Sequence, residues 1–430
     1  MRRRKPLKVA VVAMLATVVA TLLVLNLSMG DKRIDWQLPH RHAVASDQFA
    51  RTMGHLLGPP LVSGNRVQAL LNGDQIFPAM LAAIDGAQRS ISFESYIYWS
   101  GQIGLRFAQS LAQRARAGVT VHVLLDWIGS EKIDPAYLAL MKDAGVRVQL
   151  YNEPAWYSVA RLNNRTHRKL LVIDGRIGFT GGVGIADQWL GNGNTPDHWR
   201  DTHFRVEGPV VAQMQMAFLD NWIQATGEVP YGDDYFPPLS PAGGEDGNMQ
   251  AQVFTSSPGG GSESMQLMYL VAIASATRSL RLSMSYFVPD DVALATIVGA
   301  IARGVCVQII LPGPHMDVEV VRRASRASWG RLLEAGAEIY EFQPAMYHCK
   351  VMIVDERFVS VGSTNFDNRS LAVNDEANLN VLDEAFARRQ VEIFEADLAQ
   401  SRRITLEEWR ARPWRERLLE QAASLLESQL

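Results

Sequence analysis

The sequence contains HRKLLVID at residues 167–174 and HCKVMIVD at residues 348–355, and these two stretches decide the fold. Each has the form H-x-K-x-x-x-x-D. On ordinary residue frequencies, one chance match in a chain of this length is expected at about a few hundredths, and two at below roughly one in a thousand. The repeat therefore indicates a duplicated domain with chemistry in both copies.

The apolar run after each lysine predicts a buried strand that ends in a turn. Side chains at i and i+2 of a strand share a face, whereas on a helix they diverge by about 200°, so each histidine should lie beside its lysine. The two aspartates stand at odd spacing and should face the other way, as structural anchors or charge partners. The candidate catalytic set from the two motifs is His167, Lys169, Asp174, His348, Lys350 and Asp355.

Strand and helix patterns alternate around the first motif. Residues 90–98 and 119–125 are typical of strands, and residues 104–117 of an amphipathic helix. The same order recurs downstream, where GVTV at 118–121 is matched by GVCV at 304–307. We therefore expect an α/β fold of two duplicated domains, each a mostly parallel or mixed sheet flanked by helices. Packing about a pseudo-two-fold axis would give them one shared active site.

The chain divides into six expected segments. Basic residues precede an uncharged stretch from Val9 to Gly30, which is long enough to cross a bilayer as a helix. Ser28 and Gly30 would suit cleavage, but the stretch is longer than is usual for the core of a cleaved signal, so we favour an uncleaved anchor. The positive-inside rule keeps the N-terminus in the cytoplasm and the catalytic region on the other side. The segments are an N-terminal membrane anchor or signal sequence (1–30), a loop-like linker (31–66), the first domain (67–236), a Pro/Gly-rich linker (237–250), the second domain (251–400) and a helical C-terminal tail (401–430).

Composition narrows the function classes. The formal net charge of −3 gives no general polyanion-binding signature, so a nucleic-acid partner would have to be held by a local patch. Charge alone neither favours nor excludes DNA, and we favour phospholipids over nucleic acid as partners. The two cysteines, Cys306 and Cys349, exclude a disulfide framework and a thiolate-rich metal site. A lysine beside each motif histidine would repel a metal ion, so we expect no metal and no other cofactor.

Two histidines and two lysines that converge on one point suit phosphodiester transfer. A neutral imidazole can attack phosphorus and form a covalent intermediate, and a second, protonated imidazole can give a proton to the leaving oxygen. The lysines supply positive charge where the phosphoryl oxygens become more negative, a role that metal ions fill in other enzymes.

Further residues are expected to hold phosphate or orient the histidines. Small-residue turns follow both motifs at equal distance, GGVG at 181–184 and GSTN at 362–365, and such turns bring donors close to phosphate oxygens. A carboxylate on the far nitrogen of each histidine would fix its tautomer. The candidates are Gly182, Ser363, Asn365, Asp201 and Glu376.

The paired motifs, GSTNFDNRS at 362–370 and NDEANL at 374–379 resemble the phospholipase D superfamily. FESYIY at 93–98 and RARAGV at 114–119 are similar to its bacterial cardiolipin synthase branch. The resemblance implies two phospholipase D-like domains, with His167 as the nucleophile and His348 as the acid. This chain has Gly184 where the family usually has asparagine, whereas Asn365 keeps it in the second half.

The resemblance favours a phosphatidyl transferase that makes cardiolipin or a related product through a phosphohistidine. Its partners would be phospholipids such as phosphatidylglycerol and a bilayer, and its place a bacterial inner membrane with the catalytic region extracytoplasmic. A phospholipase or a membrane-tethered nuclease stays open as a hydrolytic alternative. A scaffold without chemistry is disfavoured, because both motifs are intact.

Overall fold

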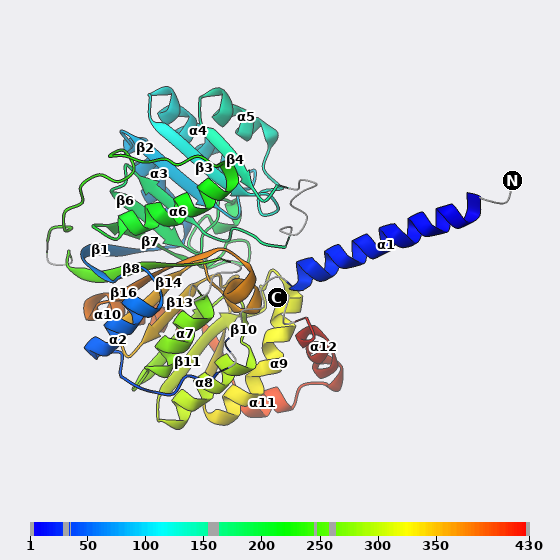
Figure 1. The fold of residues 1–430 in the computed structure, drawn as a ribbon. Coiled ribbons are helices and arrows are strands. Elements are labelled where there is room, and N and C mark those ends of the chain that lie inside the picture. Colours follow the sequence, from blue (N-terminus) through cyan, green and yellow to red (C-terminus); the bar gives the residue numbers. More distant parts are fainter. Residues whose placement is uncertain are drawn as a thin grey trace.

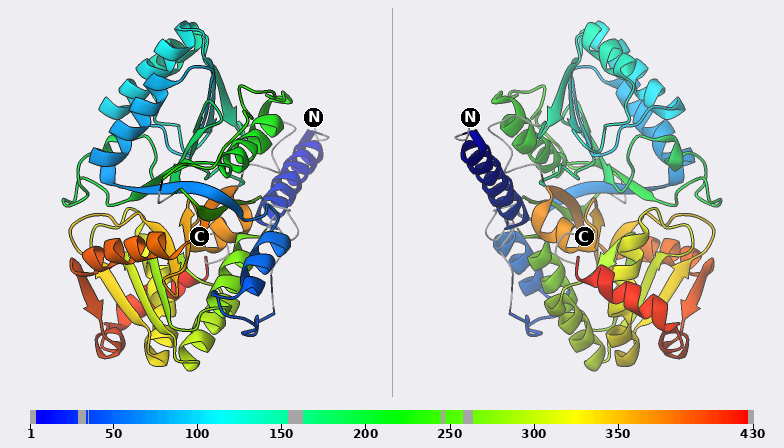
Figure 2. Two further views of the ribbon diagram at one scale, coloured as in Figure 1. Left: turned by 90° about the vertical axis from the view of Figure 1, so that its left-hand side faces the viewer. Right: turned by 90° about the vertical axis from the view of Figure 1, so that its right-hand side faces the viewer.

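The computed structural model describes residues 4–28, 34, 36–153, 163–244, 247–257 and 264–426. Two halves of the chain are stacked on each other, and helix α1 (Arg4–Ser28) projects away from them (Figure 1). Each half is a layered α/β unit, and the two side views show helices covering the sheet of each half (Figure 2). The described residues thus form two halves of similar build and one extended helix.

One mixed sheet runs through both halves and has fifteen strands in the described residues. At its centre, β1 (Val62–Leu71) of the first half pairs antiparallel with β8 (Met249–Ser256) of the second. Outward from β1 lie, in order, β7 (Thr202–Glu207), β6 (Ile177–Gly181), β5 (Leu170–Ile173), β2 (Ser90–Ser95), β3 (Thr120–Asp126) and β4 (Arg147–Tyr151). Outward from β8 lie β16 (Glu376–Leu382), β14 (Phe358–Gly362), β13 (Lys350–Val354), β9 (Ser279–Met284), β11 (Cys306–Pro312), β12 (Glu338–Phe342) and then β17 (Ser401–Ile404).

The strand order is the same in both halves when read outward from the centre, which confirms the expected duplication about a pseudo-two-fold axis. In each half the three outer strands of the repeat are parallel and joined through helices, as β-α-β connections require. The remaining pairs of this sheet are antiparallel.

Helices cover both faces of this sheet. The first half carries α3 (Asn72–Gly86), α4 (Gln102–Arg116), α5 (Pro135–Asp143) and α6 (Val211–Thr226). The second carries α7 (Met265–Ala274), α8 (Asp291–Ala302), α9 (Glu319–Ala335) and α10 (Glu384–Leu398), followed by α11 (Leu406–Arg410) and α12 (Trp414–Ser424). The expected helix at 104–117 and strand at 119–125 are confirmed as α4 and β3.

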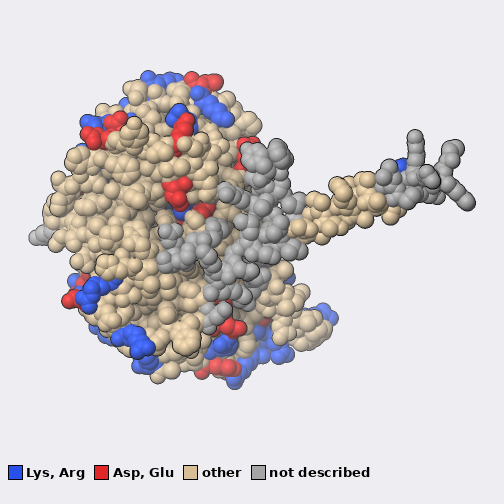
Figure 3. Space-filling model, in the orientation of Figure 1, with Lys and Arg blue, Asp and Glu red and all other residues tan. Residues whose placement is uncertain are grey.

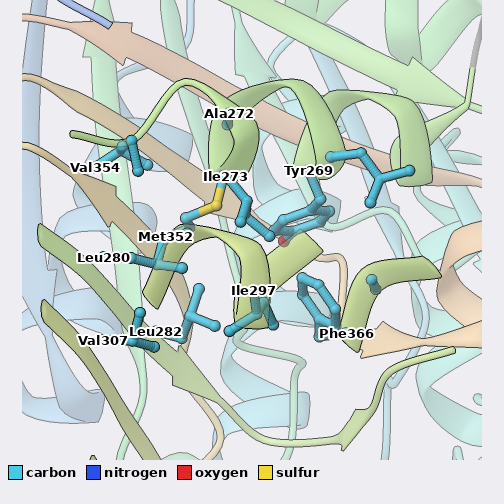
Figure 4. Packing of buried hydrophobic residues seen from close by; sticks show 14 of the residues in the cluster. Tyr269, Ala272, Ile273, Leu280, Leu282, Ile297, Val307, Met352, Val354 and Phe366 are labelled. Atoms are coloured by element: carbon cyan, nitrogen blue, oxygen red, sulfur yellow. The ribbon is translucent and has the colours of Figure 1, made fainter. Parts of the chain in front are cut away.

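In the second half, apolar side chains alternate along β9 and bury one face of the sheet against α7. Leu280 and Leu282 alternate along β9 and point toward α7, where Ile273 and Tyr269 meet them together with Met352 of β13 (Figure 4). All five are at most 1% exposed. Burying one such side chain contributes about 1.5–3 kcal/mol, so this layer fixes β13, the strand that follows His348.

A separate apolar cluster joins the halves. It combines α6 of the first half with α10 and the central strands of the second, including Phe218, Val253 and Phe386, which are all buried. Because this shared core crosses the β1–β8 boundary, the halves pack as one body around whatever lies between them.

The expectation of loop-like structure between 31 and about 60 is wrong for Asp47–Leu56, which forms α2. Ser46 caps this helix by accepting the N–H of Phe49, and Phe49 and Met53 are fully buried. The Phe49 ring packs 5.2 Å from that of Phe358, so a segment that precedes the first half belongs to the core of the second.

The expected membrane span at residues 9–30 falls partly outside the described residues, which leave out 29 and 30 and the side chains of 22–28. In the part of the chain that the structure does describe, no helix combines the length and apolar character needed to cross a bilayer. The anchor therefore stays a prediction.

Candidate active site

A cavity of about 480 Å³ lies where the two halves meet, and both motif histidines line it. Its walls come from the first half (Tyr96, Trp99, His167, Lys169) and from the second (Tyr286, His348, Asn365). The expected shared site is thus present in the geometry.

Backbone pairing between the halves positions the two histidines. His167 and Lys169 occupy the extended segment just before β5, and the His167 N–H donates to the carbonyl of Asp375 in the second half (2.9 Å). His348 just before β13 donates its N–H to the carbonyl of Arg200 in the first half (2.8 Å). Each histidine is therefore held by a segment of the opposite half.

Each histidine also contacts a carboxylate of the opposite half. His167 Nδ1 lies 2.9 Å from Glu376 Oε1, and His348 Nδ1 lies 2.7 Å from Asp201 Oδ2. An ionised carboxylate only accepts hydrogen bonds, so each Nδ1 carries the hydrogen and each Nε2 keeps its lone pair for the cavity. Asp201 and Glu376 thus lie where the sequence predicts orienting groups, but each serves the histidine of the other half.

Hydrogen bonds and nearby cations keep both carboxylates ionised. Burial alone would raise the pKa of Glu376, but His167, Lys169 and a hydrogen bond from Ser363 hold it below its usual value. Burial is likewise outweighed for Asp201, whose pKa is lowered by His348 and Lys350. Both carboxylates are therefore anionic near neutral pH.

Burial determines the protonation state of the histidines. It lowers the pKa of His167 to about 4, with Lys169 adding to the effect and Glu376 opposing it. It lowers the pKa of His348 to about 3, with a further contribution from Lys350, whose Nζ lies 3.2 Å from both ring nitrogens. Both imidazoles are neutral near pH 7 when the cavity holds no anion.

The two lysines differ in their contacts. Lys169 Nζ donates to the carbonyl of His167 (2.8 Å), and burial, with the charge of Lys350, lowers its pKa to about 7. Lys350 Nζ donates to Ser285 Oγ (2.7 Å), which in turn donates to Asn365 Oδ1 (2.7 Å). Lys350 is therefore held by two successive side-chain hydrogen bonds, through Ser285 to Asn365.

Comparison with known proteins is consistent with this geometry. The family described as "Cardiolipin synthase, PLD-like domain" matches the chain twice, at residues 80–220 and 269–398. The chain belongs to this PLD-like family. Cardiolipin synthase A of Pseudomonas fluorescens is 34% identical over 371 residues, covering 86% of this chain and 76% of that protein. Cardiolipin synthase A of Pseudomonas putida is 34% identical over 368 residues, covering 85% and 75%.

The solved structures agree in fold. Phosphatidylserine synthase from Haemophilus influenzae superposes with a TM-score of 0.67 at 14% identity, covering 89% of this chain and all of that one. This structure confirms the expected fold class, and the family match together with the cardiolipin synthase A relatives confirms the resemblance to the phospholipase D superfamily.

The aspartates of the PLD-like motifs lie away from the cavity. Asp174 follows β5 and accepts the backbone N–H groups of Gln88, Arg89 and Ser90. Asp355 follows β13 and accepts those of residues 277–279 in the same way. Both tie the end of a motif strand to the start of its neighbour, which agrees with their interpretation as structural anchors.

The post-motif turns of this PLD-like protein support the carboxylates. A Cβ on Gly182 would lie 2.3 Å from Asp201 Oδ1, so glycine leaves the space that the carboxylate fills. Its counterpart Ser363 donates to Glu376. The departure at Gly184 has a steric reason, because a Cβ there would lie 2.8 Å from Ile97 Cβ.

Aromatic side chains around the histidines were missed by the sequence analysis. Tyr96 packs edge-on to His167 at 5.0 Å, and Trp189 and Trp199 both pack at 5.2 Å from His348. Trp189 also donates to Asp201 (3.0 Å). The only signal in the sequence was the position of Trp199 two residues before Asp201.

In the described ranges, no three or more histidine, cysteine, aspartate or glutamate side chains come together as a metal site would require. That the lysines replace a metal stays a prediction.

Proposed function

We propose that this protein transfers a phosphatidyl group from one phospholipid to the hydroxyl of another, forming cardiolipin or a related product. The observation that carries the proposal is the pair of crossed histidine–carboxylate contacts at one cavity, in a chain 34% identical to cardiolipin synthase A proteins. Two oriented imidazoles beside two lysines supply a nucleophile, an acid and charge stabilisation in one place.

In the first step, Nε2 of His167 attacks the donor phosphorus. The N–P bond forms as the P–O bond to the leaving glycerol breaks, and Nε2–H of His348 gives its proton to the departing oxygen. Glu376 stabilises the positive charge that develops on His167. Lys169 and Lys350 bind the phosphoryl oxygens, which gain negative charge in the transition state.

In the second step, the now neutral His348 takes the proton from the acceptor hydroxyl. The new P–O bond forms as the N–P bond breaks, so His167 leaves neutral and His348 is protonated again. The number of protons on the enzyme is the same at the start and end of the cycle.

His348 must be protonated at the first step, although its pKa is about 3 in the empty cavity. A bound phosphodiester places a negative charge between the lysines and next to the imidazole, which stabilises the imidazolium. Binding of the substrate therefore favours protonation of His348, whereas His167 is neutral before the substrate binds.

The α1 helix supports action at a membrane. Its described side chains from Val9 to Thr21 are apolar or small, and they are uncharged along the projecting rod in Figure 3. We propose that α1 anchors the protein with the cavity beside the bilayer, where lipid hydroxyls are concentrated and can outcompete water. On the coloured parts of the face in Figure 3, basic and acidic side chains are interspersed.

The deciding experiment incubates the purified full-length protein with phosphatidylglycerol vesicles and follows the lipids by mass spectrometry. Cardiolipin and glycerol should be the main products, and added glycerol should drive the reaction backward. Phosphatidic acid as the dominant product, without cardiolipin, would replace the transferase with a hydrolase.

The assignment of the two histidines needs a second test. His348→Asn should still form the phosphoenzyme slowly from a donor with a good leaving group, whereas His167→Asn should form none. Label recovered on His348 of the His167→Asn protein would reverse the roles.

A further inference from the structure

We propose that Arg165 and Arg369 form a second anion site in the cavity, which binds the phosphate of the acceptor alcohol. The inference rests on the proposed transferase function and adds the place where the acceptor is held. It concerns a phosphate that does not react, in contrast to the donor phosphate at His167 and His348.

Both arginines line the same cavity as the histidines but come from different halves. Arg165 lies two residues before His167 in the same extended segment. Arg369 begins a short π-helical turn, Arg369–Val373, in the second half. Both side chains are hydrogen-bonded to neighbouring residues, Arg165 to Asn164 and Arg369 to Asn163, which brings the two arginines close together.

Neither guanidinium is neutralised by a partner in the described ranges. No carboxylate there lies within the 4.0 Å of an ion pair. Arg165 donates to the carbonyl of Asn164 (3.0 Å), and Arg369 donates to the side-chain and backbone oxygens of Asn163 (3.1 and 2.9 Å). These neutral oxygens orient the side chains but leave their charge available.

Two carboxylates interact with the arginines through their charges, Asp126 with Arg165 and Asp367 with Arg369, but both make hydrogen bonds to backbone N–H groups. Asp126 accepts backbone N–H groups from Ile128, Gly129 and Thr166, and Asp367 accepts that of Ser370. Burial lowers the pKa of Arg165, and the charge of Arg369 lowers it further, against the opposing effect of Asp126. An anion between the two guanidiniums would relieve this repulsion.

The duplication shows that this site is separate from the catalytic centre. Aligning the two motifs by their histidines places Met346 opposite Arg165, and aligning the turns that begin at 181 and 362 places Gln188 opposite Arg369. The catalytic groups are repeated in both halves, but the arginine pair has no repeat. The paired catalytic groups are therefore accompanied by two cavity-lining arginines that the repeat does not duplicate.

The chemistry of the acceptor calls for such a site. Its reacting hydroxyl and its own phosphate stand at opposite ends of a glycerol unit. His348, Arg165 and Arg369 all line the same cavity, in which one glycerol phosphate unit would lie between them. With the hydroxyl at His348, the phosphate would lie at the arginines, which bind phosphate through planar, bidentate hydrogen bonds.

The test compares three acceptors with phosphatidylglycerol as donor: phosphatidylglycerol itself, soluble glycerol phosphate, and labelled glycerol, which carries no phosphate. Arg165→Gln and Arg369→Gln should lower the ratio of cardiolipin formed to labelled glycerol incorporated by at least about tenfold, the value of one charge-assisted hydrogen bond. Lysine at either position keeps the charge and should restore part of the ratio. Of the two phosphate-bearing acceptors, the one that the unaltered protein uses more efficiently identifies the ligand as lipid or soluble.

The matched control is Arg388→Gln, which removes an exposed arginine on α10 and should leave the ratio unchanged. Equal loss with all acceptors, or an unchanged ratio in both glutamine variants with melting temperatures near that of the unaltered protein, would overturn the site. If one variant does not fold, the other decides the outcome. Failure of the transferase function would appear differently, as phosphatidic acid formed by the unaltered protein.

Discussion

Glu376→Gln tests whether a carboxylate of one half orients the catalytic histidine of the other half. Glu376 is fully buried and accepts hydrogen bonds from His167 Nδ1 and Ser363 Oγ. Glutamine keeps the size and removes the charge. Its amide can donate to Nδ1, which would move the hydrogen to Nε2 and remove the lone pair that attacks phosphorus.

The expected loss follows from two effects. A hydrogen bond to a charged group contributes about 1.5–3 kcal/mol, which corresponds to about 10–150-fold in rate. Inversion of the tautomer adds to this, since the equivalent change in a Ser-His-Asp site lowers kcat by about 10⁴. Glu376 also raises the pKa of Lys169, so its removal would leave that lysine less charged at neutral pH. We expect kcat to fall between about 10² and 10⁴.

The assay measures the initial burst of phosphoenzyme formed from acyl-labelled phosphatidylglycerol, together with steady-state cardiolipin. Glu376→Gln should abolish the burst, whereas Asp201→Asn, which affects the acid, should slow the leaving-group step and leave a burst with an activated donor. The control is Glu420→Gln, because Glu420 of α12 is also a buried carboxylate but pairs with Arg326 and Arg412. It should lower the melting temperature without changing the burst.

A normal burst in Glu376→Gln would refute the proposed orientation of His167. Loss of the burst in Asp201→Asn but not in Glu376→Gln would show that the nucleophile is His348.

Three further outcomes are expected. Lys169, with a pKa of about 7, is charged below that pH and neutral above it, so kcat/KM should fall as the pH rises through about 7. Lys169→Arg should move this fall to higher pH, and a fall at the same pH in the variant would exclude Lys169 as its source. Activity should survive exhaustive EDTA treatment, and complete loss restored by one stoichiometric metal would contradict the role given to the lysines. Gly182→Ala should displace the Asp201 carboxylate and lower kcat by at least about tenfold with little change in KM, whereas an equal rise in KM would indicate damage to substrate binding instead.

The duplicated fold and the paired histidines and lysines could be predicted because they depend on patterns among neighbouring residues. The H-x-K spacing and the apolar run that follows it depend only on neighbouring residues, so the duplicated strand and the paired catalytic groups were readable from 167–174 and 348–355. Asp201 and Glu376 could be nominated as orienting groups on the same basis. Each of them follows the small-residue turn of its own half, although the spacing to the turn differs between the halves.

The crossing could not be predicted, because it depends on how the halves dock. Nothing near His167 in the sequence indicates that its partner lies 209 residues away in the second half. The same holds for α2, whose Phe49 packs against Phe358 across most of the chain. Tyr96 also has no local signal, since on a strand it is typical of an ordinary core residue.

The central strand pair explains how the crossing is fixed. Glu376 begins β16, the neighbour of β8, and Asp201 immediately precedes β7, the neighbour of β1. Both carboxylates are therefore carried by strands next to the β1–β8 boundary, and each is aimed across it. A one-residue slip in these ladders would turn the carboxylates to the opposite face of the sheet. Each half thus lacks one member of both histidine–carboxylate pairs, so a half expressed alone could not orient its own histidine, even if it folded.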